Sequence, residues 1–174
     1  ITLILIEPNY LHFQERPYEI CSLILPVAIR SDNDDNKISK LFITNNDPKS
    51  QGNTIFSSKS NIQMNKYTNV LNISNVELNQ ILERNYLNKN SKVILRINCE
   101  GMEDEIIYSL HSLLQEKIVG ILGSLKDIKW AKGENEYLRL MKFIDEKKLK
   151  FLPFGDDVKT WLEAHPLIYS SFKN

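Results

Sequence analysis

The amino-acid sequence predicts an α/β protein with a mostly parallel sheet and helices packed against it. Short apolar segments alternate with segments of helical periodicity from about Val70 onward, a pattern typical of this class. The opening segment, residues 1–6, is an almost continuous run of Ile and Leu, as expected for a strand buried on both faces. A chain of 174 residues is long enough to bury one core, so we expect a single domain over residues 1–174.

The predicted strands are, in chain order, residues 1–6, 23–29, 40–44, 69–73, 92–98, 118–123 and 149–152. Proline shapes the first two, because a residue without an N–H group cannot donate to a ladder. Pro8 ends the first strand, and Pro26 marks an edge position or a bulge in the second. The first run begins without a turn or a polar leader, so we expect that more protein precedes Ile1.

The predicted helices lie, in chain order, within residues 10–20, 74–82, 103–114, 134–147 and 156–161. Pro17 cuts the first one short. Either Ser74 or Asn75 supplies the N-cap of the second. Residues 103–105 are all acidic, and carboxylates in a first turn suit the helix dipole.

A long polar stretch, residues 45–66, interrupts the alternation and is predicted to be a loop insertion. Its central part, residues 47–54, is rich in side chains that form hydrogen bonds. This part is either a lid over a substrate or a solvated excursion.

Composition excludes several classes of protein. The 22 Lys and Arg balance the 22 Asp and Glu, so neither nucleic-acid binding nor adsorption to an anionic membrane is expected, and no apolar run is long enough to span a bilayer. The cysteines, Cys21 and Cys99, have no metal-ligand spacing and are expected to be reduced thiols in a cytoplasmic protein. The histidines, His12, His111 and His165, are scattered, so no zinc site is expected.

Glu7 is the first candidate for chemistry, since it follows the carboxyl end of the opening strand. Ligands of open α/β sheets bind at such ends, where one carboxylate can accept hydrogen bonds from two ribose hydroxyls. The alternative is a residue that only ends a strand and caps the following turn.

A second candidate group follows the strand at 92–98 and consists of Asn98, Glu100 and Glu103. These side chains could bind a cation, orient a hydroxyl group or act as a general base. Gly101 would let the main chain approach a ligand closely. The alternative is that the acidic residues only stabilise the start of the helix and that Gly101 is a turn residue.

The segments LIEPN (5–9) and VILRINCEGMEDEII (93–107), in this order and spacing, resemble the FkbM-type S-adenosylmethionine-dependent methyltransferase family. Residues 25–32, 51–56 and 70–82 also look like successive segments of that family. The resemblance implies a Rossmann-like methyltransferase fold that lacks its first strand and the glycine-rich loop on it. It also implies an enzyme that transfers a methyl group from S-adenosylmethionine to a hydroxyl of a sugar or other small molecule, with a homo-oligomer as a possible assembly.

The resemblance assigns roles residue by residue. It implies that Glu7 binds the ribose hydroxyls with Asn9 close by, and that the stretch from Ala28 to Asp32, Ser31 included, lies near the adenine. The residues implied beside the methyl group and its acceptor are Asn98, Glu100 and Glu103. Asn98 stands where many members of the family have Asp, so the rival hypothesis is a truncated or degenerate relative that binds or scaffolds without catalysis.

Overall fold

The computed structural model describes residues 2–13, 21–50, 52–58, 62–114 and 117–153. Its strands are β1 (Ile4–Ile6), β2 (Leu23–Leu25), β3 (Val27–Arg30), β4 (Ile38–Thr44), β5 (Ile62–Ser74), β6 (Val93–Ile97), β7 (Ile118–Gly123) and β8 (Phe151–Pro153). Its helices are a 3₁₀ turn at Tyr10–His12, α1 (Asn75–Asn85), α2 (Glu103–Leu114), α3 (Asp127–Lys132) and α4 (Glu134–Glu146). The elements therefore alternate as the α/β prediction requires.

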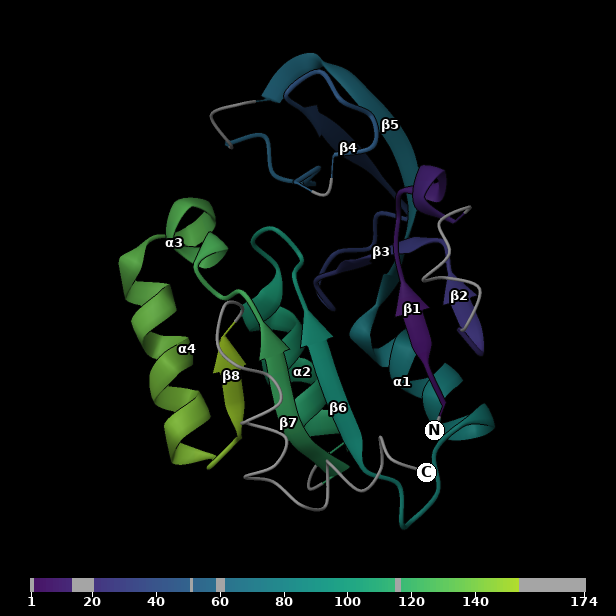
Figure 1. Cartoon of the computed structure of the whole chain (residues 1–174), viewed down its shortest axis with the longest axis vertical. Helices are drawn as coiled ribbons and strands as arrows, with labels where there is room; N and C mark the ends of the chain where they lie inside the picture. The colour runs from purple at the N-terminus through teal and green to yellow at the C-terminus, as the bar shows by residue number, and fades with distance from the viewer. Residues whose placement is uncertain (1, 14–20, 51, 59–61, 115–116, 154–174) are drawn as a thin grey trace.

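Parallel pairing dominates the described strands, which confirms the α/β class (Figure 1). β1 pairs with β2, β3 with β5, β6 with β7, and β7 with β8, all in parallel. Only the β4–β5 pairing is antiparallel among the described pairs. This single hairpin extends beyond the carboxyl ends of β6 and β7.

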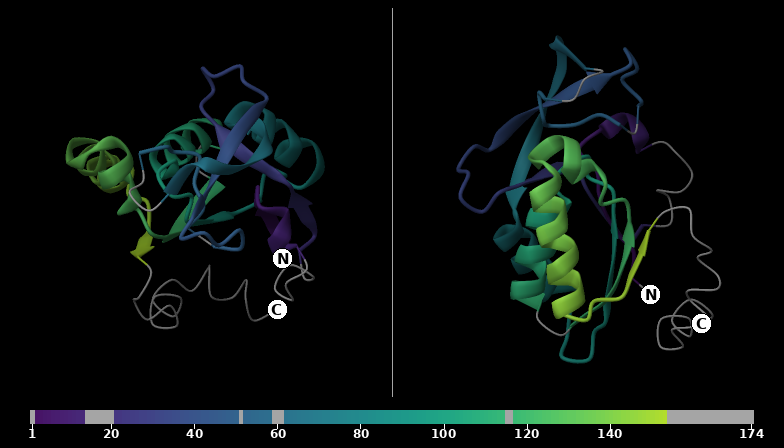
Figure 2. Two further views of the ribbon diagram at one scale, coloured as in Figure 1. Left: turned by 90° about the horizontal axis from the view of Figure 1, so that it is seen from above. Right: turned by 90° about the vertical axis from the view of Figure 1, so that its left-hand side faces the viewer.

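The helices α1, α2 and α4 lie side by side on one face of the parallel strands (Figure 2). Helical periodicity explains the position of α2, whose apolar residues recur at spacings of three and four and so share one face. The buried core residues of this layer include Leu78, Ile97, Ile106, Ile107, Leu110, Leu114, Ile121, Ile128 and Leu140. This core fixes β6 and β7, whose carboxyl ends carry the second predicted motif.

The strand predicted at 23–29 is two strands in the structure. Pro26 lacks the N–H group that a continuous ladder needs, and the chain changes sheets there. β2 ends at Leu25 and pairs with β1, whereas β3 begins at Val27 and pairs with β5. Pro26 therefore marks a break and not a bulge within one strand.

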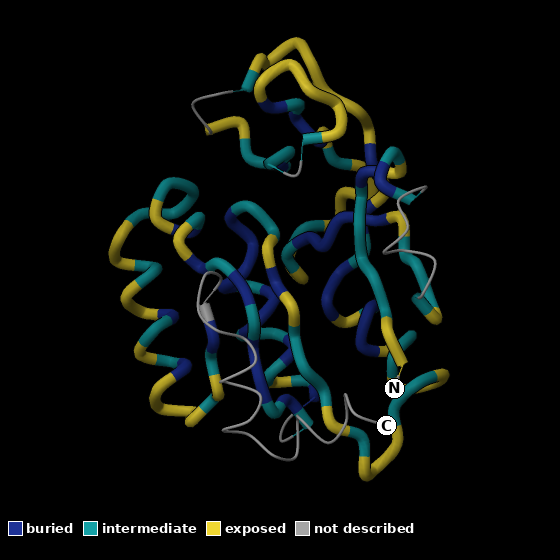
Figure 3. Tube along the Cα trace, viewed as in Figure 1, coloured by how far each residue is buried: buried dark blue, intermediate teal, exposed yellow. Residues whose placement is uncertain are grey.

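The described strands form three sheets where one was expected. The orders are β1-β2, β3-β5-β4 and β6-β7-β8, and no described ladder joins β1 to β6, although both run in the same direction in Figure 1. β5 begins at Ile62, well before the strand predicted at 69–73, so the predicted loop 45–66 is shorter in the structure. Most of the early part of β5 is exposed on both faces (Figure 3), which explains why no apolar pattern announces it.

The helix α3 has no counterpart in the prediction, because six residues are too few to establish a helical period. The helix predicted at 156–161 and the effect of Pro17 lie outside the described residues. None of the helices that the structure describes has both the length and the apolar composition needed to cross a membrane.

Ser74 is the N-cap of α1 and closes a capping box with Glu77. The main-chain N–H of Glu77 donates to Oγ of Ser74 at 3.2 Å, and the main-chain N–H of Ser74 donates to Oε2 of Glu77 at 2.7 Å. We expect Ser74→Ala to lower the free energy of unfolding by about 1 kcal/mol, because one helix N–H group loses its partner. Urea denaturation followed by circular dichroism measures the change, and a loss below 0.3 kcal/mol, on the order of a surface substitution, would contradict this role.

Candidate functional site

Glu7 and Glu100 follow different strands, and the charges of both act on the thiol of Cys99. Burial, together with the negative charge of Glu103, Glu7 and Glu100, raises the pKa of the Cys99 thiol to about 12. A charge has to lie close to a thiol to affect it in this way. The structure therefore brings the two predicted motifs to one place, at the carboxyl ends of β1 and β6, and it makes Cys99 a poor nucleophile.

The end of β1 is held by hydrogen bonds around Asn9. The main-chain N–H of Asn9 donates to Oε1 of Glu7 at 2.7 Å, which orients that carboxylate. Asn9 is itself buried: its Oδ1 accepts from the N–H of Leu11 at 3.2 Å, and its Nδ2 donates to the carbonyl oxygen of Pro48 at 2.7 Å. Asn9 thus connects the strand end to the loop between β4 and β5.

Residues 47–50 and 52–56, called the anchored loop here, are fixed to both motifs. Nδ2 of Asn53 donates to the same carbonyl oxygen of Pro48 at 3.0 Å. The hydroxyl of Thr54, which is buried, donates to the carbonyl oxygen of Glu100 at 3.0 Å. Of the two alternatives for this stretch, the bonds favour a covering structure over a solvated excursion, because Asn9 holds one side and Glu100 the other.

The main chain at Glu100 and Gly101 has an unusual conformation. Glu100 has φ of 53°, in the left-handed region, and Gly101 has φ of 117°. A β-carbon on Gly101 would lie 2.7 Å from that of Ala131 and 3.0 Å from the ring of Phe56. Close packing thus requires glycine here, whereas the sequence suggested close approach to a ligand.

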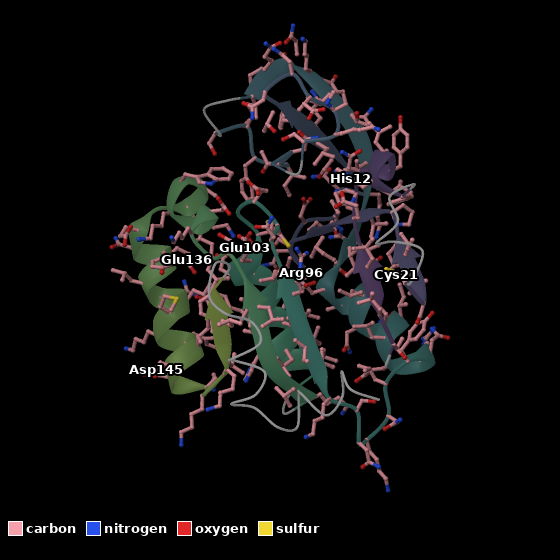
Figure 4. All side chains as sticks on the ribbon, in the orientation of Figure 1. His12, Cys21, Arg96, Glu103, Glu136 and Asp145 are labelled. Atoms are coloured by element: carbon pink, nitrogen blue, oxygen red, sulfur yellow. The ribbon has the colours of Figure 1, made fainter. Side chains whose placement is uncertain are left out.

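Glu103 differs from the role that its sequence position predicted. Its side chain has no exposed surface, and Figure 4 shows it at the end of α2 nearest the carboxyl ends of β6 and β7. Main-chain N–H groups donate to both carboxylate oxygens, from Cys99 at 2.7 Å and from Gly101 at 2.9 Å. Burial raises the pKa of Glu103 to about 7 against the effect of these bonds. A carboxylate enclosed in this way contacts the main chain and not an acceptor.

Asn98 is exposed directly after β6, so the structure leaves it accessible beside Glu100. The other cofactor-binding candidates are placed elsewhere. Ala28 packs in a small apolar cluster with Leu41 and Val70. The side chain of Ala28 therefore contributes to the packing of the sheet formed by β3, β5 and β4.

Ser31 and Asp32 lie in a hollow between α1 and α2, whose lining contains neither Glu7 nor Glu100. Asp32 accepts hydrogen bonds from the N–H of Val76 at 3.2 Å and from the hydroxyl of Ser109 at 2.7 Å. These bonds join the loop after β3 to both helices. The described hydrogen bonds thus attach Asp32 to α1 and α2, and the expectation that Ser31 and Asp32 lie near the adenine stays a prediction.

An aromatic pair beside the anchored loop was missed at the sequence level. The rings of Phe56 and Trp130 meet edge to face with centroids 6.1 Å apart, and Nε1 of Trp130 donates to Oδ1 of Asp127 at 3.0 Å. The available signal was an Ile55-Phe56 pair inside an otherwise polar stretch, since apolar residues in a loop usually pack against something.

The described part of the chain contains no group of three or more His, Cys, Asp or Glu side chains that could hold a metal ion. The chain was also compared with family models, curated proteins and solved structures. None of these matches it. The functional argument therefore depends on the site and on the motifs at 5–9 and 93–107.

Proposed function

We propose that the chain is an S-adenosylmethionine-dependent O-methyltransferase that methylates a hydroxyl group of a sugar or other small molecule. The observation that carries the proposal is that Glu7 and Glu100, which follow the strands β1 and β6, both act on the thiol of Cys99. This edge is where open α/β sheets bind their ligands. The resemblance of both motifs to the FkbM type supports the same assignment.

The residues present fit this cofactor in two respects. A carboxylate has about four lone-pair sites, so Glu7 has the capacity to accept from a ribose diol as well as from the N–H of Asn9. A sulfonium is a cation, and the carboxylates that raise the pKa of Cys99 create a negative potential that favours a cation. The cofactor supplies, when bound, a methyl group on a positively charged sulfur.

The protein has to orient the acceptor, exclude water and remove one proton. Glu100 is the candidate base for the acceptor hydroxyl, because its carboxylate lies beside the strand ends while its main chain is held by Thr54. The anchored loop is bonded to Asn9 and to Glu100, and we expect it to limit the access of water to this edge. Alignment of donor and acceptor supplies most of the remaining rate enhancement.

Isothermal titration of the 174-residue chain with S-adenosylmethionine tests the proposal. We expect Glu7→Ala to weaken binding by about 10-fold to 100-fold, since hydrogen bonds to a charged group are lost. Glu83→Ala, which removes an exposed carboxylate on α1, is the matched control and should bind like the parent chain. Equal affinities of the Glu7 and Glu83 variants would contradict the proposal, as would no binding by the parent chain.

The rival function is a binding or scaffold module without catalysis. One observation favours it: Asn9, Asp32 and Glu103 all form hydrogen bonds within the protein. Such a module predicts that Glu7→Ala and Glu100→Ala leave the activity of the protein in cells unchanged. Loss of that activity in both variants with normal folding would exclude it.

A further inference from the structure

The main chain from Cys99 to Gly101 is folded around one buried carboxylate. The N–H groups of Cys99 and Gly101 donate to Oε1 and Oε2 of Glu103, so each oxygen holds one side of Glu100. Glu100 lies between them in the left-handed region, which residues other than glycine adopt only when their surroundings hold them there. Glu103 thus determines the conformation of the candidate base.

The two hydrogen bonds depend on the ionisation of Glu103. An ionised carboxylate accepts at both oxygens, whereas a protonated one carries a hydroxyl that donates, so one of the two N–H groups loses its acceptor. Burial already places the pKa of Glu103 at about 7, where a small change in pH alters its charge.

Charged and titratable groups lie near Glu103 and influence its pKa. Asp127 on α3 raises its pKa by like charge. The Cys99 thiol, which follows β6, feels the charge of Glu103, and the carboxylates of Glu7 and Glu100 act on the same thiol. Lys132, the last residue of α3, donates to Asp104 and Glu105 on α2, so its charge is shared with these two carboxylates.

The same main-chain segment holds the anchored loop. The carbonyl oxygen of Glu100 accepts the hydrogen bond from Thr54. A change of conformation at Glu100 therefore moves both its carboxylate and the acceptor that fixes the loop.

We propose that Glu103 is a positioning residue, whose ionised carboxylate holds Glu100 and the anchored loop in place and whose protonation releases them. The consequence for the reaction rests on the proposed function. The movement of the main chain does not depend on the proposed function, so the movement and its consequence for the reaction are tested separately.

Amide resonances of Cys99 and Gly101, followed by ¹H–¹⁵N NMR between about pH 5.5 and 8.5, test the main-chain movement. We expect both to titrate with one common midpoint near the pKa of Glu103, and to lose this titration in Glu103→Gln. Amides that do not titrate, or that titrate identically in the variant, would overturn the proposal.

Asp127→Asn provides a test that leaves Glu103 intact. The amide oxygen of Asn can still accept from Trp130, while the negative charge near Glu103 is gone. We expect the common midpoint of Cys99 and Gly101 to move to lower pH. An unchanged midpoint contradicts the assignment of the titration to Glu103.

Binding of S-adenosylmethionine gives the functional readout. A group with a pKa near 7 is about tenfold less ionised at pH 6 than at pH 8, so we expect affinity to fall by up to about tenfold over this range, and to stay constant in Glu103→Gln. Binding that does not depend on pH in the parent chain overturns the inference. Absence of binding at every pH contradicts the proposed function instead, and the amide titration then decides the inference.

Discussion

Gly123→Ala is expected to lower the free energy of unfolding by about 3 kcal/mol or more. A β-carbon at this position would lie 1.9 Å from the carbonyl oxygen of Ile97, the residue opposite it on β6. Both groups belong to the main chain, so neither can rotate away. Relief requires β6 and β7 to separate at the end that carries Asn98 and Glu100.

Urea denaturation of Gly123→Ala measures this loss. Lys126→Ala is a suitable control, because Lys126 is exposed and its side chain does not cap α3, so its effect should stay within about 0.5 kcal/mol. A Gly123→Ala protein as stable as the control would show that the ends of β6 and β7 are not packed as described.

Lys132→Met is expected to cost about 3 kcal/mol, because it leaves a buried carboxylate without its partner. Nζ of Lys132 lies 2.8 Å from Oδ1 of Asp104 and 2.7 Å from Oε1 of Glu105, and the Asp104 side chain is only 4% exposed. Burial opposes the charge of Lys132, but hydrogen bonds to Asp104 and Glu105 outweigh burial and raise its pKa above the usual value. Methionine keeps most of the side-chain length, so the change isolates the charge.

A double-mutant cycle with Asp104→Asn checks the origin of this effect. Once Asp104 is neutral, Lys132→Met should destabilise the chain less, with a coupling of about 1–3 kcal/mol. Additive effects of the two substitutions would show that the effect of Lys132 does not come from its ion pair with Asp104.

Local signals were sufficient for the elements that local chemistry determines. The strand predicted at 118–123 agrees with β7. A short apolar run between polar segments identifies such a strand without any knowledge of its partner strands. The sequence offered Ser74 and Asn75 as N-caps of α1, and Ser74 is the cap in the structure. The acidic first turn of α2 was also predicted, since capping and dipole preferences act within one helical turn.

Pairing between strands was beyond local signals. Nothing in residues 62–68 distinguishes an exposed hairpin from a loop, because polar side chains there face solvent on both sides. Ladder formation depends on residues far apart in the chain, so the three separate sheets could not be derived from the pattern of each strand.

Burial of individual polar side chains was equally hidden. The sequence grouped Glu103 with Glu100, and only the fold shows that one carboxylate is enclosed by the main chain. Asp32 follows a strand as Glu7 does, yet its carboxylate accepts hydrogen bonds from residues of α1 and α2. A polar residue that follows a strand was therefore correctly expected to form specific interactions. Its position did not show whether these interactions are within the protein or with a ligand.

Glu7 and Glu100 are proposed to form one cofactor site. Crystals of the chain grown or soaked with S-adenosylhomocysteine test this claim directly through the difference electron density. We expect density at the carboxyl ends of β1 and β6, with the ribose hydroxyls within hydrogen-bonding distance of the Glu7 carboxylate and the sulfur on the side of Glu100. Density in the hollow that contains Asp32, or a ribose that does not contact Glu7, would contradict the account.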